Sequence, residues 1–283
     1  MLPAAQRARI EVLLVSPRNP LNIGAAARAM ANFGFERLSI VAPFATNWME
    51  AKSAVGAPDL LRHARVFDTL AEAVRDCTLV LGTGSLDRRR PVQALLSLPE
   101  AAKIVRQTLT VYEEDTDPSA TNRSAKAEAR VALLFGSEKH GLTSDDLTWC
   151  HGVVTIETSE AQPSMNLGQS VAVVLYELSR PPENPGQSPA AETPLTSGSD
   201  LAQSGASQPD SSQPTSAQLD RLAELVEETM EAVNYQTRGL RSANGEALRI
   251  LLRRLMPREA DLRRMMGLFR RILWQLRQSN PRS

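Results

Sequence analysis

Residues 10–35 read IEVLLVSPRNPLNIGAAARAMANFGF, and this stretch decides the fold. Its first six residues form a largely apolar run, typical of a strand that is buried on both faces. A polar loop follows, and small and apolar residues at helical spacing then predict a helix over Ile23–Phe33. A buried strand that leads through a loop into a helix is the repeating unit of an α/β protein with a parallel sheet.

The same alternation continues to residue 180 and predicts an α/β fold with a mainly parallel sheet. The predicted strands are Ile10–Val15, Leu38–Val41, Arg65–Phe67, Thr78–Gly82, Val131–Phe135 and Gly152–Ile156. The other predicted helices are Thr69–Asp76, Pro99–Leu109, Ser144–Cys150 and Leu167–Leu178. The polar stretch between Tyr112 and Arg130 is interpreted as a surface insertion.

Composition changes sharply after residue 180. Residues 181–217 contain 7 prolines and 8 serines but no Lys or Arg, and their only large apolar residues are Leu195 and Leu201. Such a segment buries too little surface to offset its ordering entropy, so we interpret it as a disordered linker. Residues 218–283 predict helices over Gln218–Asn234, Gly245–Leu255 and Glu259–Arg277, with a break at Pro257.

The helical C-terminal region is basic, although the whole chain of 283 residues has a net charge of zero. From Gly239 onward it contains 11 arginines and 3 acidic residues. These arginines either face solvent along a helix or contact the phosphates of a nucleic acid, which the planar guanidinium suits well.

Several protein classes are excluded or disfavoured by the same composition. Two cysteines cannot form a disulfide framework or a four-cysteine zinc site, and the three histidines have no metal-ligand spacing. No metal is therefore expected. No run approaches about 18 apolar residues, so no membrane span is expected. The N-terminus lacks the order of regions of a signal peptide, and we expect a cytoplasmic protein.

Four loops follow predicted strands, where ligands of α/β sheets bind. In the first, Asn22 is expected to cap the helix, and Arg28 lies about one and two-thirds turns further on. An N-cap with a surface arginine is the plain structural alternative. This loop has one glycine where a dinucleotide fingerprint needs three.

The second loop places Glu138 between Gly136 and Gly141, and a strand-to-helix turn capped by Thr143 and Ser144 is its structural alternative. The third loop contains Pro163-Ser164-Met165-Asn166, with Asn166 as a natural N-cap. The fourth is Gly82-Thr83-Gly84-Ser85, which could contact a nucleotide or cofactor.

Taken in order, three of these loops resemble the motifs of the SPOUT superfamily of RNA ribose 2′-O-methyltransferases. Asn22-x-Gly24-x-x-x-Arg28 resembles motif 1, Gly136-x-Glu138-x-x-Gly141 resembles motif 2, and Ser164-Met165-Asn166 resembles motif 3. Within the superfamily the chain is most similar to the TrmJ type, the tRNA (cytidine/uridine-2′-O-)-methyltransferases, which also carry a helical extension after the methyltransferase domain.

The resemblance implies a SPOUT methyltransferase domain over residues 1–180, with a C-terminal trefoil knot, and a tRNA-binding extension over 218–283. It implies homodimers that use S-adenosylmethionine without a metal. The implied cofactor-binding residues are Thr83, Gly84, Ser85, Gly136, Ile156, Ser164 and Met165. The implied catalytic residues are Asn22, Arg28, Glu138, Ser164 and Asn166, with Arg28 reaching the cofactor bound by the other subunit.

The implied reaction is methylation of a ribose 2′-OH of tRNA, at cytidine or uridine in position 32 of the anticodon loop. Arg28 either activates the hydroxyl or grips the adjacent phosphate and stabilises oxyanion charge, because an arginine is normally protonated. The alternatives are a ribosomal-RNA methyltransferase of the same fold, a non-catalytic RNA-binding protein, and a nicotinamide-dependent oxidoreductase. The missing G-x-G-x-x-G disfavours the last.

Overall fold

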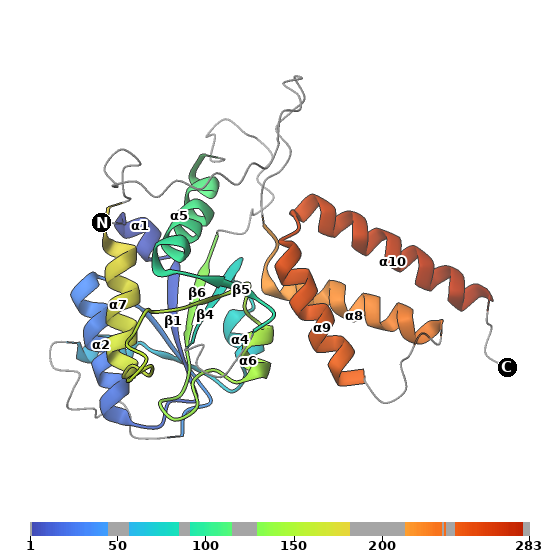
Figure 1. The fold of residues 1–283 in the computed structure, drawn as a ribbon. Coiled ribbons are helices and arrows are strands. Elements are labelled where there is room, and N and C mark those ends of the chain that lie inside the picture. Colours follow the sequence, from blue (N-terminus) through green and yellow to red (C-terminus); the bar gives the residue numbers. More distant parts are fainter. Residues whose placement is uncertain are drawn as a thin grey trace.

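A parallel sheet of seven strands forms the centre of the first region (Figure 1). The computed structural model describes residues 2–44, 57–84, 91–114, 129–181, 213–233, 235 and 241–279. The strand order is β3-β2-β1-β6-β4-β7-β5. The strands are β1 (Ile10–Val15), β2 (Arg37–Val41), β3 (Arg65–Phe67), β4 (Leu79–Thr83), β5 (Ala94–Leu96), β6 (Val131–Phe135) and β7 (Gly152–Val154). All six predicted strands are present, and the predicted parallel sheet is confirmed.

Side chains of the central strands alternate between two cores. Val12 and Leu14 of β1 face one core, whereas Leu13 and Val15 face the other. Helices α2 (Pro20–Phe33), α5 (Leu98–Glu114) and α7 (Leu167–Ser179) cover the first face, and α4 (Leu70–Val74) and α6 (Ser144–Thr148) cover the second (Figure 1). The short helices α1 (Ala4–Arg7) and α3 (Pro58–Arg62) were not predicted.

Helices α2 and α7 lie side by side because small residues line their contact (Figure 1). A Cβ atom on Gly168 would lie 2.6 Å from the Cβ of Ala25, so the packing requires glycine at this position. The amino ends of both helices therefore meet at the edge of the sheet where β1 and β6 end. This contact positions the site described below.

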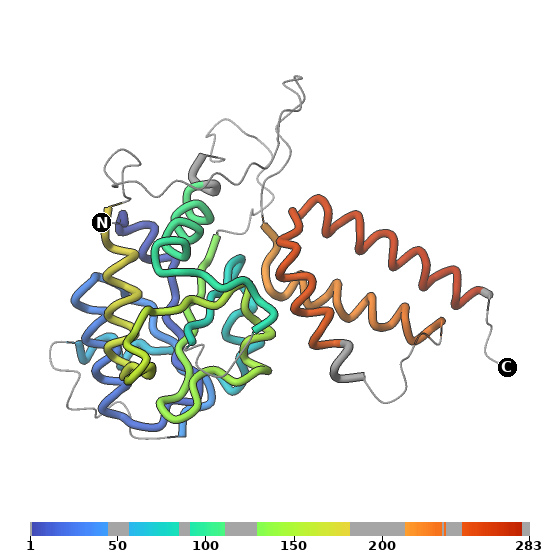
Figure 2. The backbone as a smooth tube through the Cα atoms, in the orientation of Figure 1, coloured from blue at the N-terminus to red at the C-terminus, as the bar shows by residue number. Residues whose placement is uncertain are grey.

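The C-terminal region is a three-helix unit with a core of its own (Figure 2). It consists of α8 (Ser216–Ala232), α9 (Arg241–Leu255) and α10 (Glu259–Ser279). Met256, with a positive φ of 43°, and Pro257 separate the last two helices as predicted. Thr215 caps α8, so the last two residues assigned to the linker belong to this helix. Residues 182–212 of the predicted linker and most of the 112–130 insertion lie outside the described residues.

The buried Arg253 joins the two regions. Its guanidinium has no solvent exposure; Nε donates to the Trp149 carbonyl at 3.1 Å, and Nη2 donates to Asp220 Oδ1 at 3.0 Å. Arg249 lies over the Trp149 ring, 4.1 Å from its centroid, and donates to Thr148 Oγ1 at 3.0 Å. Two of the arginines that suggested nucleic-acid contact therefore hold α9 against α6.

In the part of the chain that the structure describes, no helix is both long and apolar enough to cross a membrane.

Arg253→Ala should lower the free energy of unfolding by about 3 kcal/mol, because it leaves Asp220 and a buried carbonyl without their partner. Urea unfolding of the full chain measures this. Arg254→Ala is the matched control, since it makes the same change at the next, exposed position of α9 and should stay within about 0.5 kcal/mol of wild type. Equal stability of the two variants would contradict the joining role of Arg253.

Candidate functional site

A cavity of about 330 Å³ opens at the carboxyl ends of β4, β6 and β7. Its walls are the loops that the sequence singled out. The residues that line it are Thr83, Gly84, Pro91, Phe135, Gly136, Ser137, Glu138, Lys139, His140, Gly141, Leu142, Leu147, Val153, Ile156, Thr158, Pro163, Ser164, Met165, Leu167 and Ser170. Six of the seven predicted cofactor-binding residues are in this wall, and the seventh, Ser85, lies outside the described residues.

The loop after β6 is a tight turn that requires glycine at Gly136 and favours it at Gly141. A Cβ on Gly136 would lie 2.0 Å from the carbonyl carbon of Gly141, a distance that real atoms do not tolerate. Gly141 has a φ of 64°, in the left-handed region, and its N–H donates to the Ser137 carbonyl at 2.8 Å. The turn presents backbone groups to the cavity. Thr143 caps α6 as predicted, through a capping box with Asp146.

The Glu138 carboxylate connects this turn to the loop after β1. Oε2 accepts from the Arg18 N–H, and Oε1 accepts from the Asn19 N–H and from Asn22 Nδ2, all at 3.0 Å. Burial raises the pKa of Glu138, but the hydrogen bonds from the Asn22 amide and the backbone N–H groups lower it more, so the pKa lies below its ordinary value. The carboxylate is therefore ionised at neutral pH.

Asn22 does not cap α2, and this prediction was wrong. The N-cap is Asn19, whose side chain accepts from the Leu21 N–H at 2.9 Å, because Pro20 occupies the first position of the helix. Asn22 is thereby free to bridge two other loops. Its Nδ2 donates to Glu138, and its Oδ1 accepts from Asn166 Nδ2 at 3.0 Å.

Asn166 caps α7 as predicted, with Oδ1 accepting from the Gly168 and Gln169 N–H groups. Its other amide atom completes a continuous set of hydrogen bonds. We call Arg18, Asn19, Asn22, Glu138 and Asn166 the Glu138 network. Three loops that lie far apart in the sequence are fixed by it at one edge of the sheet.

The remaining predicted catalytic residues lie in two places. Ser164 is exposed and lines the cavity next to the Glu138 network. Arg28 is also exposed, but it lies further along α2 and does not line the cavity. Its side chain makes no hydrogen bond or ion pair that the structure shows among the described residues. A single subunit therefore does not bring Arg28 to the cavity.

The part that Arg18 and Asn19 play in holding Glu138 was not predicted, because both act through backbone N–H groups that almost any residue type offers. Pro20 at the start of a helix was the signal that could have moved the expected cap to Asn19. The buried histidine and cysteines do no chemistry in the cavity. Burial lowers the pKa of His151 to about 3, and burial raises the pKa of Cys77 and Cys150 to about 12. Among the described residues there is no cluster of metal-ligating side chains.

The profile of the SpoU rRNA Methylase family matches residues 9–176, which include every predicted site residue. The chain belongs to this family. It is 40% identical over 171 residues to the tRNA (cytidine/uridine/adenosine-2′-O-)-methyltransferase TrmJ of Pseudomonas aeruginosa. This match covers 60% of each of the two chains. It is 34% identical over 173 residues to the tRNA (cytidine/uridine-2′-O-)-methyltransferase TrmJ of Salmonella typhimurium, covering 60% of this chain and 63% of that one. The matches thus span about three-fifths of these relatives' length.

Solved structures extend the likeness beyond the SpoU domain. TrmJ from Z. mobilis superposes with a TM-score of 0.70 at 26% identity, over 93% of this chain and 98% of that one. A probable methyltransferase from Bordetella pertussis gives a TM-score of 0.53 at 30% identity, over 62% of this chain and 98% of that one. The helical C-terminal region is therefore part of an arrangement seen in a TrmJ structure.

Gly136→Ala should destabilise the protein by about 1–3 kcal/mol, because the new methyl group forces the Gly136–Gly141 turn apart. Gly267→Ala is the matched control, since a Cβ there meets nothing within 4 Å and alanine favours the helix. Melting temperatures of the two full-length variants decide the point. A Gly136→Ala protein that melts as high as wild type would show that the turn can open without cost.

Proposed function

We propose that this protein transfers a methyl group from S-adenosylmethionine to the ribose 2′-OH of a tRNA. The observation that carries the proposal is the junction of the three motif loops, held by the Glu138 network, at the rim of the cavity. Membership of the SpoU family and the tRNA methyltransferases among its relatives support it.

The cavity fits S-adenosylmethionine in size and lining. Its volume is at the lower end of the range for small-molecule sites. Leu142, Val153 and Ile156 offer an apolar wall for an adenine ring, and the Gly136–Gly141 turn offers backbone donors and acceptors next to two positions that carry no side chain. When bound, the cofactor supplies an electrophilic methyl group on a positively charged sulfur.

The residues of the chain then have two tasks. They hold the 2′-oxygen in line with the methyl group, and they assist removal of a weakly acidic proton. Ser164 and the amides of Asn22 and Asn166 are at the rim of the cavity, where they can orient a ribose hydroxyl. Glu138 is ionised and accepts three hydrogen bonds, so it positions Asn22 and does not donate a proton.

Arg28 completes the site from a second subunit in this proposal. It is exposed and lies away from its own cavity, as a residue that serves a partner's cavity would. A homodimer, a metal-free reaction and a cytoplasmic location belong to the same proposal. The trefoil knot and position 32 of the anticodon loop as the target also belong to it.

The direct test uses purified protein, S-adenosylmethionine with a tritiated methyl group, and either unmodified tRNA or ribosomal RNA. Label in tRNA, released by nuclease digestion as a 2′-O-methylated nucleoside, is the expected result. Label in ribosomal RNA alone would support the ribosomal alternative of the same fold. No label in either RNA would support a non-catalytic RNA-binding protein.

Arg28→Ala should reduce turnover well over tenfold while the affinity for S-adenosylmethionine stays within about twofold. Arg62→Ala, which removes another exposed arginine, is the control and should keep full activity. Mixing Arg28→Ala chains with Gly136→Ala chains, whose distorted turn should no longer bind the cofactor, should restore part of the activity, because a mixed dimer contains one intact composite site. Failure of complementation in dimers shown to be mixed would place each site within one chain.

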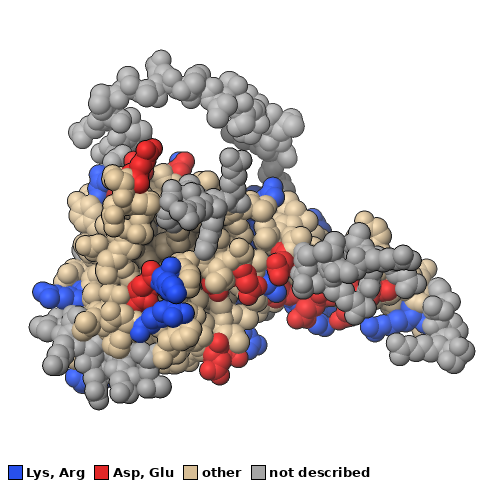
Figure 3. Space-filling view, turned by 60° about the horizontal axis from the view of Figure 1, so that its bottom comes forward, with Lys and Arg blue, Asp and Glu red and all other residues tan. Residues whose placement is uncertain are grey.

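The exposed arginines of the extension should bind the body of the tRNA. Seven of the nine arginines with described side chains after Gly239 are exposed. On the face shown in Figure 3, basic and acidic side chains are interspersed over both regions, so no single basic field covers it.

Replacing Arg270 and Arg271 by glutamine should weaken tRNA binding about tenfold and reduce its salt dependence by about two counterions. The same double change at Arg62 and Arg75, which are exposed on the first region, is the control. Titrations at two salt concentrations with the full chain measure both effects. An unchanged affinity for tRNA after the α10 substitutions would show that these two arginines face solvent and do not bind tRNA.

A further inference from the structure

An arginine–aromatic pair stands beside the Glu138 network. The guanidinium carbon of Arg18 lies 4.3 Å from the centre of the Phe44 ring, and Phe44 is 64% exposed. Arg18 follows β1 and Phe44 follows β2, so two neighbouring strand ends supply the pair. Neither motif 1 nor the predicted reaction accounts for an exposed ring at this point.

The backbone fixes both residues in place. The Phe44 N–H donates to the Pro17 carbonyl at 3.2 Å, and the Arg18 N–H donates to Glu138 at 3.0 Å. The two strands leave the sheet through Ser16 and Ala42, whose φ angles of 49° and 45° are costly for residues other than glycine. Both strands therefore lead into their loops through a residue with positive φ. The Phe44 ring is held next to Arg18, a member of the Glu138 network.

The short distance between a ribose and its own base determines which part of a bound nucleotide can reach Phe44 and Arg18. A ribose held at the Glu138 network carries its base within the reach of one nucleotide, and a base taken out of an RNA stack needs a new stacking partner. Aromatic rings and arginine planes are the side chains that receive such bases, and they do so for any of the four. Arginine also binds the adjoining phosphate.

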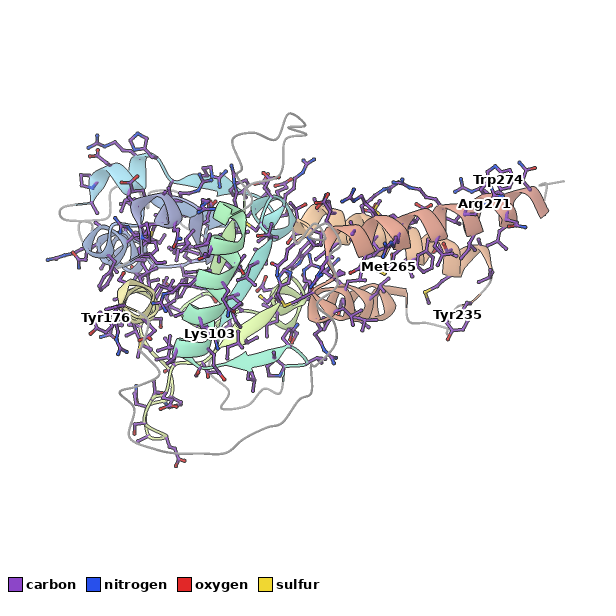
Figure 4. All side chains as sticks on the ribbon, turned by 90° about the horizontal axis from the view of Figure 1, so that it is seen from above. Lys103, Tyr176, Tyr235, Met265, Arg271 and Trp274 are labelled. Carbon is purple, nitrogen blue, oxygen red and sulfur yellow. The ribbon has the colours of Figure 1, made fainter. Side chains whose placement is uncertain are left out.

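We propose that Phe44 and Arg18 form the stacking platform for the base of the nucleotide that is methylated. This inference rests on the proposed function. The Phe44 ring supplies the stacking face, and the Arg18 guanidinium, which already contacts the ring, covers the base or its phosphate. Another exposed pair of this kind among the described residues, Arg271 over Trp274, lies on α10 in the C-terminal helical region (Figure 4).

The experiment compares methyl transfer to unmodified tRNA by four full-length proteins: wild type, Phe44→Leu, Phe44→Tyr and Val66→Ala. Phe44→Leu keeps an apolar side chain but removes the ring, so kcat/KM for tRNA should fall at least about tenfold. Phe44→Tyr restores the ring and should stay within threefold of wild type. Val66→Ala, which shortens another exposed apolar side chain on neighbouring β3, should change nothing. All four should bind S-adenosylmethionine within twofold of one another.

Three results would overturn the platform: Phe44→Leu as active as wild type, Phe44→Tyr as impaired as Phe44→Leu, or loss of cofactor affinity in step with activity, which would show a structural role. If the wild-type protein and Phe44→Leu methylate tRNA equally well, the platform is refuted and the proposed function is not. Wild-type protein that methylates no RNA refutes the proposed function, and the platform with it.

Discussion

The ionised carboxylate of Glu138 is the constraint on which the site depends. An ionised carboxylate only accepts hydrogen bonds, and when it is partly buried it requires several donors. Two backbone N–H groups of the loop after β1 and the amide of Asn22 meet that requirement. The donors lie in the loop after β1 and the first turn of α2, and the acceptor lies 116 or more residues away in the chain, so these two segments keep a fixed relation.

Close packing of helices α2 and α7 extends this relation to the third loop. Gly168 lets α7 approach Ala25, and the approach brings Asn166 within hydrogen-bonding distance of Asn22. Each asparagine amide uses both of its polar atoms, so neither can rotate without losing at least two partners. The cavity, the network and the Phe44–Arg18 pair thus share one rigid edge of the sheet.

Much of this arrangement was predictable from local patterns. The buried strands and the cap at Asn166 follow from hydrophobic periodicity and capping chemistry, and the similarity to known motifs led to the loops that line the cavity. The cap at Asn22 was predicted wrongly because the first helical turn was placed too late, although Pro20 marks it. β5 was missed because its residues, Ala94–Leu96, include none of the β-branched or aromatic types that favour a strand. The buried role of Arg253 could not be read from sequence, since its partners lie on elements 33 and 104 residues away.

The C-terminal helices combine two uses of arginine. Arg249 and Arg253 pack against α6, and Leu147 of this helix also lines the cavity. The exposed arginines further along α10 remain available to RNA. Because α9 packs against α6, the exposed arginines of α10 are held in a fixed position relative to the cavity.

The methyl-transfer rate of Glu138→Gln, measured in the full chain at saturating S-adenosylmethionine, tests the central claim most directly. A glutamine side chain replaces one carboxylate oxygen by an NH2 group, which would face an N–H donor instead of accepting its hydrogen bond. The loops should therefore separate, and the rate should fall at least about tenfold. Glu160→Gln, the same change at an exposed position in the loop before motif 3, should leave the rate within threefold of wild type. A Glu138→Gln protein that is as active as the Glu160→Gln control would contradict the account.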